Sequence, residues 1–393
     1  MIMLGDIMKK ITIGMFTDSF FPMVDGVAVV IDNYAKRLSK IANVIVFCPK
    51  YNNKKCDDSK YDYKVVRCMS TKFPFIDYNL ATPKLDLKFE KEVNKYDLDI
   101  IHIHSPFSVG KLGAEYAKKN NIPLVGTMHS QYKQDFLRAV RSETMANIMT
   151  KEIIKVYDKC DRCFTVNDEV ARIYCEEYGS INKPVIIRNA TDMTLLEGDD
   201  SYIDKKYSIK NDEKVFLFVG RINALKNVFF IVDALKILKE KDIKFKMLFV
   251  GTGQDEDNLE EYIKENNLED NIIMCGSIND REMLRKYYKR ADLFLFPSLY
   301  DTNSLVQIEA ASQKTPGVFL RESATSATIE DNVTGFLTDN SSEDYASKII
   351  EVINNKKLYN KVCENVYNKI YITWDDTVKD LFKNYEEVLK KLE

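Results

Sequence analysis

The side chains best suited to hold a phosphorylated ligand follow short apolar runs of the chain. Arg221 and Lys226 stand five residues apart in GRINALKN, directly after the run VFLFV. A guanidinium can bind two phosphate oxygens at once and an ammonium acts as a point charge, so this pair could neutralise a diphosphate. An ordinary surface salt bridge is the alternative role for the two cations. A diphosphate site built on them would rely on side chains rather than on a metal.

Two carboxylates stand eight residues apart at a loop-to-helix junction, Asp301 and Glu309 in FPSLYDTNSLVQIEAASQ. Their oxygens could accept hydrogen bonds from sugar hydroxyls while the backbone amides of Ser304, Leu305 and Val306 face a phosphate. The structural alternative makes Asp301 the helix cap and Glu309 a carboxylate of the first turns.

Glycines mark two further turns that could approach a ligand. Gly26 follows Asp25 and opens a helical stretch whose amides could receive a phosphate. Gly251 and Gly253 form a G-x-G after another apolar run. A helix-start glycine and a tight turn are the respective structural alternatives.

The histidines and cysteines are the candidate metal ligands. All three histidines, His102, His104 and His129, fall within 28 residues, and the first two share a face of one predicted strand. A three-histidine metal site is one interpretation, but no orienting carboxylate is evident nearby, and we favour strand-end histidines beside a polar ligand. Cys160 and Cys163 form a C-x-x-C with no second pair at zinc-knuckle spacing. We expect reduced thiols and no bound metal.

A recurring pattern of short apolar runs, each followed by an amphipathic stretch, must position these residues. This βαβ rhythm predicts parallel strands buried on both faces. The predicted strands are residues 11–16, 43–48, 99–104, 123–127, 162–166 and 184–188, then 215–220, 245–251, 271–276, 292–297 and 316–320. We expect an α/β protein of two doubly wound Rossmann-like domains facing a cleft, with ligands beyond the carboxyl ends of the strands.

A polar stretch, LLEGDDSYIDKKYSIKNDEK, separates the two series of strands. We therefore place the first domain at residues 1–192 and the second at 193–372. A final helix over 373–393 is expected to return and brace the first domain. Trp374, the one tryptophan, is expected just before that helix as a packing anchor.

Composition and charge exclude several classes of protein. With 45% hydrophobic and 30% charged residues and only 14 glycines and 9 prolines, the chain is neither disordered nor collagen-like. No apolar run approaches the roughly 18 residues of a membrane span, and the start MIMLGDIMKKITIGMF lacks the basic flank of an export signal. Residues 1–192 hold 29 cationic against 24 acidic side chains, whereas residues 193–393 hold 28 against 36. This thin basic excess suits an anionic surface or a solvated face, and no nucleic-acid partner is expected.

Several stretches form an ordered set along the chain: TDSFFPMVDGV, HIHSPFSVG, GTMHSQY, VIIRNATD, FVGRINALKN, LFVGTG, CGSI and FPSLYDTNSLVQIEA. In this order and spacing they resemble the motifs of the family 4 glycosyltransferases. The resemblance covers nearly the whole chain. It implies a GT-B fold of two Rossmann-like domains, and a retaining hexosyltransferase that needs no metal or other cofactor and takes a nucleotide sugar, UDP-glucose first, as co-substrate.

The resemblance also implies roles for individual residues. Arg221 and Lys226 would hold the charge of the donor diphosphate, His129 would lie near the donor sugar, Asp301 would grip the hexose and Glu309 would bind the ribose hydroxyls. The implied catalytic residues are His129, Arg221 and Lys226, and the implied donor-binding residues are Gly26, Val27, Gly220, Gly251, Gly253, Ser277, Ile278, Asp301, Ser304, Leu305, Val306 and Glu309. The acceptor hydroxyl would enter on the face that the nucleotide leaves, with the leaving phosphate as base.

The sequence departs from the family pattern at several of these places. The family usually has Glu at the position of Asp301, Gly at those of Ala190 and Ser304, and Cys-Gly at Gln313-Lys314. A catalytically silent relative that binds or regulates a partner through the same cleft is therefore a second hypothesis. Retention of His129 together with both cations and Glu309 argues against it.

The opening GMFTDSFFPMVDGV and the stretch TMHSQYKQDF look most like bacterial enzymes that glycosylate diacylglycerol. The stretch from Gln131 to Lys159 mixes apolar residues with cations and suits contact with an anionic lipid surface, the alternative being an ordinary surface helix. A polysaccharide or polyprenyl-linked glycan acceptor stays open. We expect a cytoplasmic protein, with peripheral attachment to the inner membrane face as the open question.

Overall fold

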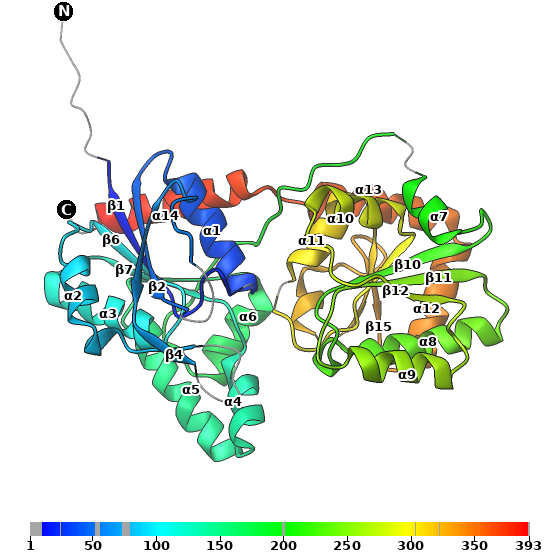
Figure 1. The fold of residues 1–393 in the computed structure, drawn as a ribbon, viewed down its shortest axis with the longest axis horizontal. Helices are drawn as coiled ribbons and strands as arrows, with labels where there is room; N and C mark the ends of the chain where they lie inside the picture. The colour runs from blue at the N-terminus through cyan, green and yellow to red at the C-terminus, as the bar shows by residue number, and fades with distance from the viewer. Residues whose placement is uncertain are drawn as a thin grey trace, which may run out of the picture. The chain divides into compact units, whose positions relative to one another are not determined.

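The computed structural model describes residues 10–23, 25–51, 56–72, 79–198, 201–302, 304–321 and 323–391. The chain forms two compact units, Met1–Arg188 with Trp374–Glu393, and Asn189–Thr373 (Figure 1). The structure thus divides the chain after Arg188, where the sequence suggested residue 192. Residues 1–9, on which the expected absence of an export signal rests, lie outside the described ranges.

The first unit is built on a parallel sheet in the order β3-β2-β1-β6-β7-β8-β9. Every strand predicted in the first half is present, whereas β3 and the antiparallel pair β4 and β5 are additional. The bounds are β1 Thr12–Phe16, β2 Asn43–Pro49, β3 Lys64–Cys68, β4 Ser70–Lys72, β5 Asn79–Ala81, β6 Ile100–Ile103, β7 Leu124–Met128, β8 Arg162–Thr165 and β9 Val185–Ile186. β9 is much shorter than the predicted strand 184–188, and Val185 is exposed at the sheet edge.

Helices cover both faces of this sheet, which is why its strands are continuous apolar runs. Their starts follow local capping: the Asp25 carboxylate, for example, accepts the amide of Ala28 in the first turn of α1. The helices are α1 Gly26–Leu38, η1 Pro83–Leu85, α2 Leu87–Val93, α3 Ser108–Asn120, α4 Tyr132–Val140, α5 Glu143–Tyr157, α6 Asp168–Arg172, η2 Ile173–Glu177 and α14 Trp374–Lys390.

The second unit contains a parallel sheet in the order β12-β11-β10-β13-β14-β15. Its strands are β10 Lys214–Val219, β11 Phe245–Val250, β12 Ile272–Met274, β13 Leu293–Leu295, β14 Gly317–Leu320 and β15 Phe336–Thr338, of which only β15 was not predicted. Its helices are α7 Tyr202–Tyr207, η3 Ala224–Lys226, α8 Val228–Glu240, α9 Glu256–Glu265, α10 Arg281–Arg290, α11 Leu305–Ser312, η4 Ala324–Thr328, α12 Ser342–Asn354 and α13 Lys356–Lys369.

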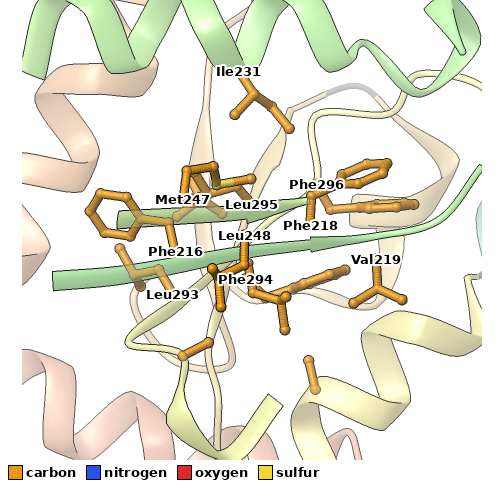
Figure 2. Packing of buried hydrophobic residues seen from close by; sticks show 14 of the residues in the cluster. Phe216, Phe218, Val219, Ile231, Met247, Leu248, Leu293, Phe294, Leu295 and Phe296 are labelled. Atoms are coloured by element: carbon orange, nitrogen blue, oxygen red, sulfur yellow. The ribbon is translucent and has the colours of Figure 1, made fainter. Parts of the chain in front are cut away.

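The core of the second unit is formed by side chains from its central strands (Figure 2). The rings of Phe218 and Phe296 stack with centroids 5.8 Å apart, and Phe294 stacks on Phe296 at 5.3 Å. Ile231 of α8 packs over the same strands and is fully buried. Because β10 and β13 are packed so tightly, the loops that follow them start from well-defined positions.

In both sheets the strand order reverses once, between β1 and β6 in the first unit and between β10 and β13 in the second. Such reversals are the topological switch points at which ligands of doubly wound sheets bind, outside the carboxyl ends of the strands. The loops after these four strands are therefore the candidate ligand-binding loops.

The last helix, α14, is an integral part of the first unit. Trp374 is its first residue rather than the residue before it, and its ring meets that of Tyr34 on α1 edge-on at 5.9 Å. Further along, the hydroxyl of Tyr385 lies 2.6 Å from Nδ1 of His102 on β6. His102 Nε2 lies 2.7 Å from the hydroxyl of Thr127 on β7, so α14 is tied to the centre of the sheet.

The three histidines of this unit are buried and uncharged. Burial lowers the pKa of His129 to about 3 and holds the pKa values of His102 and His104 well below their ordinary range. In the unfolded chain each would titrate near pH 6.5. The unfolded state therefore binds more protons than the folded state below that pH, and stability is lost as the pH falls.

We predict that the first unit loses about 4 kcal/mol of unfolding free energy between pH 7.5 and pH 5.5 from these histidines, since each contributes roughly 1.4 kcal/mol one pH unit below 6.5. The single tryptophan lies in this unit, so urea titrations followed by tryptophan fluorescence report its unfolding selectively. A His102→Asn variant should show a shallower pH dependence. Equal stability at the two pH values would contradict buried neutral histidines.

Candidate functional site

The loops after β10 and β13 meet at the switch point of the second unit through an ion pair between Lys226 and Asp301. The two side chains are 18% and 17% exposed, so the pair is partly shielded from water. The other Asp301 oxygen accepts the hydroxyl of Ser298 at 2.7 Å, and Lys226 Nζ lies 5.7 Å from the centre of the Phe296 ring. The predicted cation and carboxylate are therefore brought together.

Local hydrogen bonds fix where each partner of this pair lies. The side chain of Asn223 accepts the backbone amide of Lys226 at 3.2 Å and caps the short helix η3. The side-chain amide of Asn227 donates to the carbonyl of Pro297 at 3.3 Å, and the hydroxyl of Thr325 donates to the carbonyl of Asp301 at 2.8 Å. Asp301 does not cap α11, so the alternative structural role considered for it is wrong. The N-cap residue is Ser304.

Arg221 follows Gly220 at the end of β10 and is exposed at the same edge of the sheet. The sheet thus presents both predicted cations in the loop after β10, with Asp301 from the neighbouring strand's loop. Two positive side chains at a switch point suit an anionic ligand.

The loop after β11 requires glycine at positions 251 and 253, because a Cβ there would clash with the protein's own backbone. A Cβ on Gly251 would lie 1.8 Å from the carbonyl oxygen of Gly220, and one on Gly253 would lie 2.0 Å from that of Ile222. Gly251 also has a φ of +142°, a conformation that side chains disfavour. Close loop packing accounts for both residues, and their predicted donor contacts remain predictions.

Glu309, on α11, is 5% exposed and has a partner on each oxygen. Oε1 accepts from the guanidinium of Arg281 at 2.7 Å and Oε2 accepts the hydroxyl of Tyr288 at 2.9 Å. Arg281 also reaches the hydroxyl of Thr191 at 3.4 Å. Each carboxylate oxygen has two lone-pair directions, so Glu309 retains capacity for ligand hydroxyls. Arg281 and Tyr288 were missed by the sequence reasoning, because only the fold brings α10 against α11.

The remaining predicted contacts of the second unit surround these groups. Ser304, Leu305 and Val306 form the partly exposed start of α11, and the Ser304 side chain makes no capping hydrogen bond to the first turn. Ser277 and Ile278 follow β12, where the carbonyl of Gly276 accepts the amide of Gly251 at 2.9 Å. Ser277 and Ile278 lie on the loop after β12, and Ser304, Leu305 and Val306 lie where the loop after β13 enters α11.

In the first unit, His104 and His129 follow β6 and β7 and contact each other. His104 Nδ1 lies 3.1 Å from His129 Nε2, and the two side chains are 0% and 8% exposed. His102 uses both ring nitrogens for Tyr385 and Thr127. A three-histidine metal site would need one of those nitrogens, so this alternative does not fit. Among the described residues no cluster of three histidine, cysteine or acidic side chains is arranged to hold a metal ion.

Gly26 and Val27 are the first residues of α1, as predicted, and the carboxylate of Asp25 lies beside them. The Asp25 carboxylate accepts the amide of Ala28 at 2.7 Å and the hydroxyl of Ser19 at 2.5 Å. A phosphate at this helix start would have to share the first turn with Asp25. The space around Gly26 is open.

Asp18, which the sequence reasoning missed, joins the loops at the switch point of the first unit. Its carboxylate accepts the hydroxyl of Ser105 at 2.6 Å and the amides of Val109 and Gly110 at 2.9 and 3.3 Å. Burial raises the pKa of Asp18, although these hydrogen bonds act in the opposite direction. An Asp directly after the first predicted strand was the only available signal.

Two family models match the chain in succession. The model described as Glycosyltransferase Family 4 matches residues 24–195, and the one described as Glycosyl transferases group 1 matches residues 199–369. Each match falls largely within one of the two units. Together they span most of the sequence, including all the predicted site residues.

Curated relatives and solved structures agree with these matches. The alpha-monoglucosyldiacylglycerol synthase of Streptococcus pneumoniae is 26% identical over 96% of this chain and 88% of its own length, and that of Acholeplasma laidlawii is 24% identical over 90% and 91%. HepE of Anabaena, solved with UDP, has a TM-score of 0.78 at 16% identity over 96% of this chain and all of the other. A sucrose-phosphate synthase of Thermosynechococcus elongatus has the same TM-score at 19% identity over 97% and 100%. With two Rossmann-like parallel-sheet units in the GT-B arrangement of elements, the chain belongs to glycosyltransferase family 4.

Proposed function

We propose that this glycosyltransferase moves a hexose from a UDP-sugar, UDP-glucose first, to a hydroxyl of a diacylglycerol-type lipid, with retained anomeric configuration and no metal. The observation that carries the donor half is the meeting of Lys226 and Asp301 at the switch point of the second unit. This meeting supports the proposal because an ammonium group suits phosphate oxygens and the neighbouring carboxylate can accept sugar hydroxyls.

The ion pair leaves both partners able to bind a ligand. Lys226 has three ammonium protons, so it can keep Asp301 and still donate to a phosphate oxygen. Asp301 is held by Lys226 and Ser298 and has lone-pair directions to spare for a hexose hydroxyl. Asp is one methylene shorter than the Glu usual in the family, and the contact with Lys226 fixes where its carboxylate lies.

The chemistry follows from where charge develops. As the bond between the sugar and the nucleotide breaks, negative charge accumulates on the leaving diphosphate. Arg221 and Lys226, already positioned, would stabilise that charge in place of a metal. The departing phosphate would take the proton of the acceptor hydroxyl. Glu309, held in place by Arg281, would bind the ribose hydroxyls.

Two observations support the proposed lipid acceptor: the names of two relatives and the surface formed by α4 and α5. The two synthases named above are named for a diacylglycerol product. Four apolar side chains of α4 and α5 are 37% to 50% exposed: Leu137, Val140, Met145 and Ile148. Cations lie on the same stretch: Lys133, Arg138, Arg141, Lys151 and Lys155. Arg138 and Lys155 pair with Asp135 and Glu152, which leaves a modest positive surface around apolar side chains.

A glycan acceptor is the second candidate. A galactosyltransferase of Escherichia coli, named for a GlcNAc-diphosphoundecaprenol acceptor, is 26% identical over 74% of this chain. Within the described ranges no helix is both long and apolar enough to cross a bilayer.

The test of the proposed function is to incubate the purified protein with candidate nucleotide sugars and a bacterial lipid extract in the presence of a chelator. We expect mass spectrometry to find a hexose added to diacylglycerol. Transfer to an added polyprenyl-linked glycan alone would overturn the lipid acceptor. The absence of both hexose transfer and nucleotide release would overturn the catalytic proposal and favour a catalytically silent relative.

Removal of the Lys226 ammonium should slow transfer by about 100- to 1,000-fold, the cost typical of losing one preorganised charge-stabilising donor. The Lys226→Met variant should show this loss mainly in kcat, measured as UDP release with acceptor present. Lys236→Met, an exposed lysine of α8 in the same unit, is the matched control and should retain normal turnover. Near-normal turnover of Lys226→Met would make the assigned role of this cation wrong.

The surface formed by α4 and α5 should bind anionic vesicles. We expect the protein to float with phosphatidylglycerol vesicles and not with phosphatidylcholine vesicles, and the double variant Leu137→Ser with Ile148→Ser to lose most of this binding. Ile181→Ser, which removes an 81% exposed apolar side chain outside α4 and α5, is the control. Flotation unchanged in the double variant would contradict the assignment of this surface.

A further inference from the structure

Glu309 is a buried carboxylate whose two oxygens are both held by side chains of α10. The guanidinium of Arg281 donates to Oε1 at 2.7 Å, and the hydroxyl of Tyr288 donates to Oε2 at 2.9 Å. Arg281 and Tyr288 are seven residues apart on α10, which is about two helical turns, so they lie on the same face of the helix. The packing of α10 against α11 therefore fixes the orientation of the carboxylate.

The two donors differ in charge and in exposure. Tyr288 is fully buried, and burial together with the charge of Glu309 raises the pKa of its hydroxyl well above the ordinary value, so it stays a neutral donor. Within the described parts of the chain, Arg281 is the one cation that pairs with this carboxylate. A buried carboxylate that lacks a charged partner is strongly disfavoured. Compensation of the charge on Glu309 thus depends on Arg281.

Arg281 lies at the exposed side of this arrangement. Its side chain is 54% exposed, whereas that of Glu309 is 6% exposed. Its second terminal nitrogen donates to the hydroxyl of Thr191 at 3.4 Å, so the guanidinium is held at two points. Arg281 also begins α10, three residues after Ile278, one of the predicted donor-binding residues. The guanidinium is therefore placed where a nucleotide would reach Glu309.

The contacts from α10 leave a defined set of acceptor directions on Glu309. One donor on each oxygen leaves one lone-pair direction free on each. Two hydroxyls on adjacent carbons can use these directions together, because a vicinal diol and a carboxylate present their oxygens at similar spacing. A carboxylate that could rotate freely would lose entropy on binding the same diol. Fixing both oxygens thus favours a ligand that donates from two adjacent hydroxyls.

We infer that Arg281 is a positioning residue that makes Glu309 selective for a nucleotide with both ribose hydroxyls, while Tyr288 holds the second oxygen. This inference rests on the proposed binding of the donor ribose by Glu309. It gives α10 a part in choosing the donor, although neither of its two residues needs to touch the reacting atoms.

The test compares UDP with 2′,3′-dideoxyuridine diphosphate, which lacks both ribose hydroxyls, by isothermal titration calorimetry. We define the diol ratio as the Kd of the dideoxy ligand divided by the Kd of UDP. For the wild-type protein we expect a diol ratio of about 100, roughly tenfold for each hydrogen bond to a carboxylate. Arg281→Met should lower the ratio to about 10 or less, and Arg281→Lys, which keeps a cation near Oε1, should restore most of it.

The diol ratio separates positioning from a purely structural role. Loss of folded protein lowers the active fraction for both ligands and leaves the ratio unchanged. Arg285→Met is the matched control, because Arg285 lies on the next turn of α10 and pairs with Glu282 and Thr194 instead. It should keep the wild-type ratio.

The outcomes distinguish this inference from the proposed function. A wild-type diol ratio in Arg281→Met would overturn the positioning role and leave the ribose role of Glu309 intact. A ratio near 1 in the wild-type protein would overturn the ribose role of Glu309, and the inference with it.

Tyr288→Phe decides the matter if Arg281→Met does not fold. Phenylalanine fills nearly the same space and removes only the hydroxyl that donates to Oε2. We expect the diol ratio to fall by about 3- to 10-fold in this variant, since one oxygen of Glu309 is no longer held. An unchanged ratio would overturn the claim that α10 sets the selectivity of this carboxylate.

Discussion

The ion pair between Lys226 and Asp301 is the interaction on which the candidate site depends. It connects the loops after β10 and β13, the two strands between which the sheet order reverses. The tight aromatic packing of Phe218, Phe294 and Phe296 beneath these loops gives both partners fixed starting points. A cation held at such a place is ready to meet a phosphate without further ordering, which is the condition for charge stabilisation in a reaction.

In the first unit, hydrogen bonds among buried side chains, rather than an ion pair, fix the ends of the central strands. The ends of β6 and β7 carry buried, uncharged histidines. One of them, His102, is hydrogen-bonded to Tyr385 of α14. Asp18 joins the loops on either side of the strand reversal by accepting two amides at the start of α3. The loops after β1 and β6 are thus joined by hydrogen bonds to a buried carboxylate, whereas the loops after β10 and β13 are joined by an ion pair.

The sequence predicted the strands well where they are buried on both faces, because continuous apolar runs such as VFLFV have few alternative structures. It missed β3, whose KVVRC contains two cations, and the three-residue β15. Lys226 and Asp301 were selected from their positions after predicted strands, and the fold explains why that works: loops after neighbouring parallel strands meet at one edge. Arg281 and Tyr288 could not be found this way, since their contact with Glu309 depends on how α10 packs against α11.

The structure also explains the departure from the family pattern at Gln313-Lys314. Lys314 has a φ of +62°, where glycine is favoured, and Gln313 instead bonds the backbone of Thr194 and Leu196.

We propose that side chains of the second unit hold the charge of a nucleotide diphosphate without a metal. Isothermal titration calorimetry of UDP and uridine against the protein in the presence of a chelator tests it most directly. We expect UDP to bind at least 100-fold more tightly than uridine, a difference of about 2.7 kcal/mol, and the chelator to leave this binding unchanged. Equal binding of the two ligands, or UDP binding that requires added Mg²⁺, would contradict it.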